Sequence, residues 1–276
     1  MGSYTDFLKK RLLSSVITLV GLSLLIFFLA RILPGDPALA ALGEFASKEQ
    51  LEAFRKELWL DKPLHLQYFK FIYDLLNFRL GLSVLTWHDV AYDISLTFPA
   101  TFELILTSMV LAIVIGPALG VISATKSTKL SGTFSRVFSV FGVAFPRFFL
   151  CIILQLIFAF WLSLLPAGGR LSPWIDKPLH ITGLYLIDSL LTLRFDIFLD
   201  ALSHIILPAL SLALSPIAQL AALTYAKMAD ELKKDYVIAF KANKIPEKII
   251  YYKYALKNAF SASLTTIGLF FGAFFE

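Results

Sequence analysis

Charged residues are scarce in this chain: Asp, Glu, Lys and Arg make up only 16% of its 276 residues, whereas they form about a quarter of an ordinary soluble domain. A single cysteine, Cys151, excludes a disulfide-stabilised fold. The 14 glycines and 12 prolines follow no repeat, which excludes collagen-like and low-complexity classes. Because 58% of the residues are hydrophobic, too little polar surface remains to cover a soluble globule. The composition therefore predicts a polytopic membrane protein.

Signatures of catalysis and metal binding are also missing from the sequence. The four histidines lack the spacing of a zinc site, and neither a G-x-S-x-G elbow nor an H-E-x-x-H motif occurs. Residues 120–127 come close to a phosphate-binding loop, but Thr125 stands where the second glycine is required, and the segment ends a predicted membrane span. We therefore predict no catalytic residue, no metal site, and no cofactor bound by this chain.

Long apolar runs dominate the sequence instead. The first is about 33 Å long as a helix, which exceeds the hydrocarbon core of about 30 Å. It follows Lys9, Lys10 and Arg11 and precedes no cleavage pattern, so it is predicted to be an uncleaved anchor. We predict an all-α transmembrane helical bundle with five spans, at residues 12–33, 101–124, 137–162, 205–225 and, more weakly, 259–275.

The distribution of charge predicts how these spans are oriented. The N-terminus and the 126–136 and 226–258 segments together carry fourteen Lys and Arg residues against five acidic residues. The 34–98 and 163–203 segments carry nine basic against thirteen acidic residues. Because cytoplasmic loops are enriched in Lys and Arg, the N-terminus is predicted to be cytoplasmic. The basic surface then faces anionic lipid, and no nucleic-acid partner is expected.

Three parts follow from this pattern: an anchor span at 1–33, an external segment at 34–98, and a membrane core at 99–276. In the external segment, Ser47 and Gln50 predict a capping box that begins a short amphipathic helix. A second amphipathic helix is predicted after Pro63. The two form either a folded cap over the first span or a contact surface for other subunits. Residues 181–199 are interrupted by charges and are predicted to be interfacial, as are Glu103 and Arg31.

The segment at 226–258 has a helix–break–helix pattern. Tyr236, Val237 and Phe240 follow helical spacing, and small residues at 239 and 242 would let another surface approach closely. Pro246 disfavours helix at Ile245 and can begin the next helix. Such a helix at the membrane face suits the binding of a soluble partner. The alternative is an ordinary basic loop.

Six short motifs, in order along nearly the whole chain, resemble one transporter family. They are LPGDP at 33–37, FPATFEL at 98–104, GPALG at 116–120, LPAGG at 165–169, HIILPALSL at 204–212 and DYVIAFKANKI at 235–245. Each motif is weak alone. Together they resemble the inner-membrane permeases of the dipeptide, oligopeptide and nickel group of ATP-binding-cassette importers, of the dipeptide permease B type, and the last motif resembles the EAA loop of that family.

The resemblance implies a role for the chain and a set of partners. The partners would be a second homologous permease, two cytoplasmic ATPase subunits that bind ATP and Mg²⁺, and an external substrate-binding protein. The 47–77 helices would contact that binding protein, and the cargo would be peptides or, alternatively, nickel chelates or oligosaccharides. The implied ATPase-coupling residues are Asp235, Tyr236, Val237, Ala239, Phe240, Lys241, Ala242, Asn243, Lys244 and Ile245.

The sequence departs from the family in two places. Lys244 stands where the family has a glycine, so we expect the left-handed backbone position to shift to Asn243, which tolerates it better. The family also continues past the position of Glu276 with a further span, so we expect a truncated gene, a fragment or a partial chain. Two other classes are therefore kept: a non-transporting remnant and an ATP-independent carrier or channel.

One charge falls within a predicted span. Pro146 and Arg147 lie near the middle of residues 137–162, where an arginine costs about 2.5–3.5 kcal/mol on insertion scales. Arg147 is predicted to face the translocation pathway or a substrate carboxylate. The alternatives are a structural pair with Gln155 or a partner subunit, and a shifted span boundary.

Overall fold

The computed structural model describes residues 4–32, 37–43, 46–83, 85–125 and 145–275. The chain divides into two compact units, Met1–Ser95 and Leu96–Glu276. Within the described residues the regular structure is helical, apart from one isolated antiparallel bridge between Leu82 and Asp89. The all-α prediction is therefore confirmed.

The first unit consists of a long helix and three short ones: α1 (Tyr4–Ile32), α2 (Pro37–Leu42), α3 (Lys48–Glu57) and α4 (Leu64–Leu76). The predicted capping box is present, because Ser47 Oγ accepts from the Gln50 backbone N–H at 3.2 Å and the Gln50 side chain accepts from the Ser47 N–H at 3.0 Å. The predicted second helix is α4, which begins directly after Pro63.

Helix α4 packs on α1 through aromatic residues. Phe27 of α1 is buried, and its ring lies 5.4 Å from that of Tyr68 and 5.8 Å from that of Phe71. The Tyr68 hydroxyl is also 2.9 Å from Ser23 Oγ. These contacts agree with a folded cap on the first span, the first of the two alternatives.

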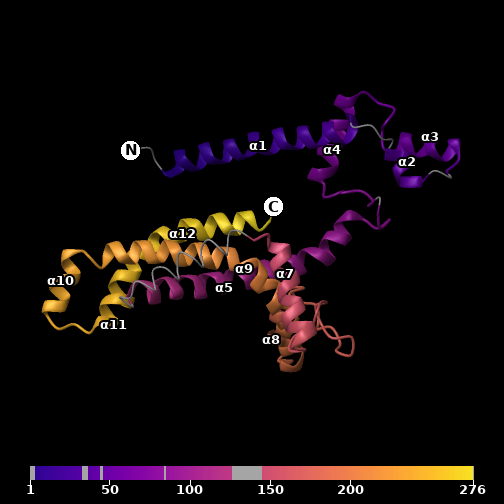
Figure 1. Cartoon of the computed structure of the whole chain (residues 1–276). Helices are drawn as coiled ribbons and strands as arrows, with labels where there is room; N and C mark the ends of the chain where they lie inside the picture. The colour runs from indigo at the N-terminus through magenta and orange to yellow at the C-terminus, as the bar shows by residue number, and fades with distance from the viewer. Residues whose placement is uncertain (1–3, 33–36, 44–45, 84, 126–144, 276) are drawn as a thin grey trace. The chain divides into compact units, whose positions relative to one another are not determined.

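The second unit is built around three long helices that run side by side, α5 (Val90–Thr125, from Leu96 onward), α9 (Phe195–Glu231) and α12 (Leu256–Ala273) (Figure 1). α7 (Arg147–Gln155) continues as a π-helix, η1 (Leu156–Trp161), and α8 (Tyr185–Leu191) precedes α9. Both α7 and α8 contact α9. α10 (Asp235–Ala242) and α11 (Glu247–Ile249) follow α9, and the π-helix η2 (Ile250–Ala255) leads from α11 into α12.

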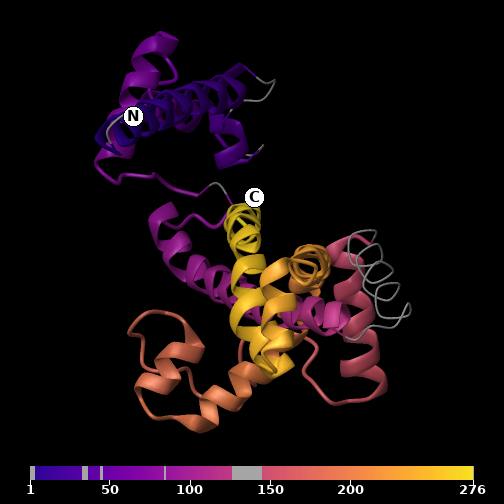
Figure 2. The same ribbon diagram turned by 90° about the vertical axis from the view of Figure 1, so that its left-hand side faces the viewer.

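Two glycines bring α5 into close contact with α9. A Cβ atom at Gly116 would lie 2.8 Å from Leu220 Cβ, and one at Gly120 would lie 2.6 Å from Thr224 Cβ. Below this crossing, Ala112 packs with Ala213, and partly buried side chains of α12 cover the cluster. The GPALG motif at 116–120 therefore has a packing role, and in Figure 2 α5 crosses obliquely behind the yellow C-terminal part of the chain.

Three of the helices are long and apolar enough to cross a membrane: α1, α5 and α9. α1 covers residues 12–32 of the first predicted span. α5 and α9 contain the spans predicted at 101–124 and 205–225, but they already begin at Val90 and Phe195. Residues 195–199 therefore belong to α9 and not to a separate interfacial segment. The helices at the third and fifth predicted spans are shorter, with apolar helical stretches at Arg147–Trp161 and Ser263–Ala273.

The third predicted span is not one continuous helix. Phe145 and Pro146 are non-helical, and Pro146 has φ −58° and ψ 137°. Proline lacks a backbone N–H and disfavours helix at the residue before it, so it begins α7 and does not continue an earlier helix. Arg147 is thus the first residue of α7. The part of this prediction at 137–144 lies outside the described residues.

Candidate functional site

Helix α10 is the segment that the sequence predicts to be a coupling element. It begins after Lys234 and ends at Ala242, so the predicted helix, break and second helix are all present. The break is formed by two backbone bonds: the Lys244 N–H donates to the Lys241 carbonyl at 3.0 Å and the Ile245 N–H to the Phe240 carbonyl at 3.0 Å. This pair is the Schellman motif, which requires a left-handed residue just after the helix.

That left-handed residue is Lys244, with φ 56°, whereas Asn243 has φ −82°. The expected shift of the break to Asn243 is therefore wrong. The left-handed conformation lies at Lys244, because the two hydrogen bonds of the motif require it there. A lysine in this conformation lacks the steric freedom of glycine and costs about 1–2 kcal/mol.

The two faces of α10 differ in their exposure. Val237 is fully buried, and the Phe240 ring packs 4.7 Å from that of Tyr254 and 5.7 Å from that of Tyr236. These side chains attach α10 to its own chain, and each of them is buried or half-buried. The opposite face is exposed along an i, i+3, i+4, i+7 stripe, hereafter the α10 outer stripe, formed by Asp235, Ile238, Ala239 and Ala242.

Ile238 was not among the residues predicted for coupling, although its side chain is 61% exposed. The sequence could have indicated this residue, because Ile238 follows Asp235 by three positions and residues at this spacing lie on the same side of a helix. The remaining predicted residues lie at the end of the helix. Lys241 is exposed and forms an exposed 3.8 Å pair with Glu247, and Ile245 is half-buried.

Beside α10, three side chains donate to one carboxylate, and this group of four residues is hereafter the Glu231 junction. Glu231 ends α9 and accepts from Lys234 Nζ at 2.5 Å, from the Tyr236 hydroxyl at 2.9 Å and from Asn258 Nδ2 at 3.4 Å. Burial and the Glu231 hydrogen bond raise the pKa of Tyr236, so its hydroxyl stays protonated as a donor. The hydrogen bond to Glu231 likewise raises the pKa of Lys234.

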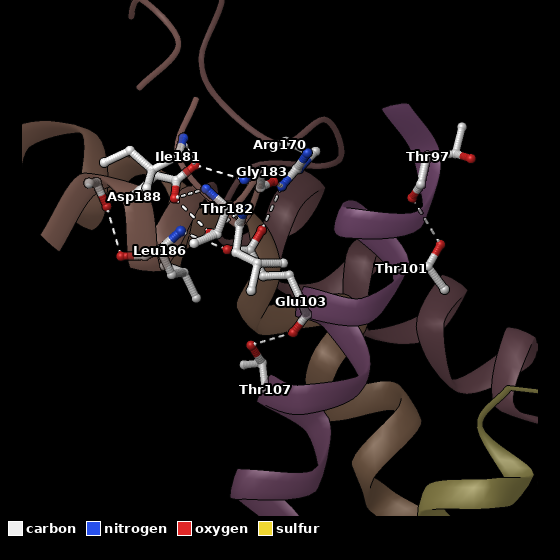
Figure 3. A network of polar contacts seen from close by, with 12 residues as sticks. Thr97, Thr101, Glu103, Thr107, Arg170, Ile181, Thr182, Gly183, Leu186 and Asp188 are labelled. Atoms are coloured by element: carbon white, nitrogen blue, oxygen red, sulfur yellow. Dashed lines mark hydrogen bonds and ion pairs between the residues drawn. The ribbon is translucent and has the colours of Figure 1, made fainter. Parts of the chain in front are cut away.

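A second polar group lies at the opposite end of α9, around Glu103 of α5 (Figure 3). Glu103 is 6% exposed. Its Oε2 accepts from Arg170 Nη2 at 2.8 Å, and its Oε1 accepts from the Leu186 N–H at 2.6 Å. The Arg170 guanidinium also donates to the Gly183 carbonyl at 3.0 Å and lies 3.6 Å over the Tyr185 ring. Glu103 is therefore a buried carboxylate paired within the protein, a role that the sequence did not predict.

Asp188 holds the loop before α8 in the same network. Its carboxylate accepts from the backbone N–H groups of Ile181, Thr182 and Gly183 and from the Thr182 hydroxyl, at 2.6–3.3 Å. Burial favours the neutral acid, but the hydrogen bonds from Thr182 and the neighbouring backbone outweigh it and lower the pKa of Asp188. Asp188 is thus a buried structural carboxylate and not an interfacial charge.

The same loop is attached to α9. The carboxylate of Asp200 accepts from the Ser172 N–H at 2.8 Å and from the Ser172 hydroxyl at 2.7 Å. Between this loop, α5 and α9 lies a cavity of about 230 Å³, whose polar lining includes Glu103, Arg170 and His204. The cavity is lined mostly by apolar residues, and its charged groups already pair with one another.

The predicted pathway residues Pro146 and Arg147 lie apart from both polar groups, at the start of α7. The Arg147 guanidinium is 5.4 Å from the centre of the Phe274 ring. Gln155, a predicted structural partner of Arg147, instead donates its amide to the Ala167 carbonyl at 2.8 Å. In the described ranges, no group of three or more His, Cys, Asp or Glu side chains is arranged to hold a metal ion.

These features, long apolar helices joined by a helix–break–helix segment, are those of a transport permease, and comparison with known families agrees. Residues 4–105 match the family described as "Binding-prot-dependent transport system membrane comp, N-term". Residues 116–276 match the family described as "Binding-protein-dependent transport system inner membrane component". The chain belongs to this family of inner-membrane permeases of ATP-binding-cassette transport systems. Members of the family are transport components and are not themselves catalytic.

Curated relatives are similar over almost the whole chain. A probable D,D-dipeptide transport system permease of Escherichia coli K12 is 35% identical, over 98% of this chain and 79% of its own length. A dipeptide transport permease of Alkalihalophilus pseudofirmus is 35% identical, over 94% and 78%. A glutathione transport permease of Pectobacterium atrosepticum is 32% identical, over 97% and 78%. The family resemblance drawn from the six motifs is confirmed.

Proposed function

We propose that this permease forms a pathway for short peptides together with a second, homologous permease. The cargo is inferred from the relatives, whose names specify dipeptides, D,D-dipeptides and glutathione. The other partners are an external binding protein and two cytoplasmic ATPase subunits that hold ATP and Mg²⁺. Nickel chelates and oligosaccharides are the competing cargoes that a transport assay distinguishes.

Coupling to the ATPase subunits takes place at the α10 outer stripe. The observation that carries this proposal is the division of α10 into a buried face, which fixes the helix to its own chain, and an exposed face with Ile238 at its centre. Small side chains on either side of Ile238, at Ala239 and Ala242, allow a partner backbone to approach closely. An exposed isoleucine among small residues suits insertion into an apolar groove.

The orientation follows from the same proposal. If α10 meets cytoplasmic ATPases, then the C-terminal end of α9 is cytoplasmic and the network around Glu103 is external. The N-terminus is then cytoplasmic as well, in agreement with the excess of Lys and Arg on that side. Helices α3 and α4 are external and available to the binding protein. Pro146 and Arg147 remain candidates for the lining of the pathway.

The test is an Ile238→Asp variant of the complete transporter, reconstituted in proteoliposomes with its binding protein and a labelled dipeptide mixture. A charge in the centre of the docking surface should reduce co-purification of the ATPase subunits, and ATP-dependent uptake with it, by about tenfold or more. Ile249→Asp is the matched control, because Ile249 is also exposed but lies in α11. Unchanged ATPase binding in Ile238→Asp contradicts the docking proposal, and uptake of nickel chelates or oligosaccharides instead of peptides contradicts the cargo.

A further inference from the structure

We infer that Glu231 is a positioning residue that fixes the coupling helix α10 to α9 and α12, so that the three helices move together when an ATPase subunit displaces α10. This inference rests on the proposed docking at α10. It assigns a role to a residue outside the EAA-like motif, whose side chain lies behind the docking helix and is only 12% exposed.

The geometry places one carboxylate where three helices meet. Glu231 is the last residue of α9, Tyr236 lies in the first turn of α10, and Asn258 lies in the first turn of α12. Tyr236 and Asn258 both donate to the same oxygen, Oε2, so this atom is the direct link between α10 and α12. The third donor, Lys234, reaches the other oxygen from the turn between α9 and α10.

Without this junction, α10 is held mainly by apolar contacts and short connections. α9 and α12 are already packed together near Glu231, through buried Met228, Ala255 and Ala259. α10 is only eight residues long, and it is attached by the buried Val237 and by the contact of the Phe240 ring with the Tyr254 ring. Such contacts resist separation but give little resistance to rotation, because dispersion forces are non-directional. Directional hydrogen bonds to a charged acceptor supply that resistance.

The ionised carboxylate is required for the full set of bonds. Its two oxygens accept from three donors, and they carry no proton of their own. A glutamine at this position has one acceptor oxygen and one NH₂ group. In one orientation the NH₂ group faces Lys234, and in the other it faces Tyr236 and Asn258, so a donor always meets a donor. Glu231→Gln therefore changes the junction with almost no change of volume.

Hydrogen exchange in the complete reconstituted transporter tests the inference without knowledge of the cargo. Orthovanadate and MgATP are added so that the ATPase subunits trap ADP–vanadate, which is used to displace α10. Amide exchange is followed in α10 and in the first two turns of α12. In the wild type both segments should change together. In Tyr236→Phe and Glu231→Gln, the change in α12 should fall by about fivefold or more, whereas the change in α10 and the rate of ATP hydrolysis stay close to those of the wild type.

Two further variants are used: one is a control, and the other tests the link if the first variants fold poorly. Lys234→Met removes a donor to the same carboxylate, but Lys234 is 55% exposed and such pairs contribute little, so transmission to α12 should be unchanged. Asn258→Ala removes only the α12 side of the link at an exposed position, and should reduce transmission even if changes at Glu231 or Tyr236 lower the yield of folded complex.

The inference is overturned if α12 responds to the trapped nucleotide as strongly in Tyr236→Phe and Asn258→Ala as in the wild type. It is equally overturned if Lys234→Met has the same effect as these variants, if α12 of the wild type does not respond, or if Tyr236→Phe loses the ATPase subunits. Failure of the docking proposal is a separate result, because it is read from ATPase binding in Ile238→Asp.

Discussion

At the scale of single residues, Lys244 shows how the hydrogen bonds at a helix end determine which residue adopts the left-handed conformation. The sequence suggested that the left-handed conformation would move to Asn243, since asparagine tolerates it better than most residues. The hydrogen bonds of the helix end do not allow this shift: moving the position by one residue would break both the Lys244–Lys241 and the Ile245–Phe240 backbone bonds. The conformation therefore stays at Lys244, with φ 56°.

Lys244→Gly should consequently stabilise the end of α10. Glycine adopts this conformation without steric cost, so local opening should become less favourable by about 1 kcal/mol, which corresponds to about fivefold slower exchange of the Ile245 amide. Hydrogen-exchange mass spectrometry of the protein in detergent measures this rate. Asn243→Gly is the control: Asn243 has φ −82°, so glycine there should speed exchange. Faster exchange in Lys244→Gly would contradict the explanation.

Other single residues could not be interpreted from the sequence because their partners are distant in the chain. Glu103 and Arg170 are separated by 67 positions and meet only when the loop before α8 folds against α5. Asp188 looked like an interfacial charge, yet it is buried with backbone N–H groups around it. The pattern of polar and apolar residues shows where such a carboxylate lies in the chain, but it does not predict which hydrogen-bond donors surround it in the fold.

At the scale of helices, local signals predicted the elements well. The capping box at Ser47, the start of α4 after Pro63 and the break at Pro246 all depend on residues a few positions apart, and all are present. Boundaries of the long helices were less accurate. α5 begins at Val90 and α9 at Phe195, so each helix extends beyond its apolar run through a first turn that carries an aspartate, Asp93 or Asp196. Hydropathy alone does not mark such a turn as part of the span.

The crossing of α5 and α9 gives a prediction at this scale. A side chain at Gly120 has no space, because its Cβ would lie 2.6 Å from Thr224 Cβ and 2.7 Å from the Ala221 carbonyl oxygen. Gly120→Val should therefore separate the helices and destabilise the protein by about 1–3 kcal/mol, seen as a lower melting temperature in detergent. Gly268→Ala in α12 is the matched control, since nothing lies within 4 Å of that position. An unchanged melting temperature for Gly120→Val would show that the crossing is not rigid.

At the scale of the whole molecule, helix α9 connects the two polar groups. Its 37 residues extend about 55 Å, well beyond a hydrocarbon core of about 30 Å. Asp200 near its start binds the loop of the Glu103 network, and Glu231 at its end forms the junction with α10. If α9 crosses the membrane, the two polar groups lie on opposite sides of it. Which side is cytoplasmic depends on the charges of the connecting segments and not on packing.

Cysteine labelling determines that orientation, because Cys151 is the chain's single cysteine and can be replaced by serine. In this background a new cysteine is introduced at one of two exposed positions. Trp174, in the loop before α8, is 82% exposed, and Lys248 is exposed in α11. The two variants are Trp174→Cys and Lys248→Cys. If the excess of Lys and Arg marks the cytoplasmic side, a membrane-impermeant maleimide should label Trp174→Cys in intact spheroplasts and Lys248→Cys only after permeabilisation. The reverse pattern would place α10 outside the cell, where no ATPase subunit could reach it, and would contradict both the orientation and the coupling role. Labelling of both sites in intact spheroplasts would show that α9 does not cross the membrane.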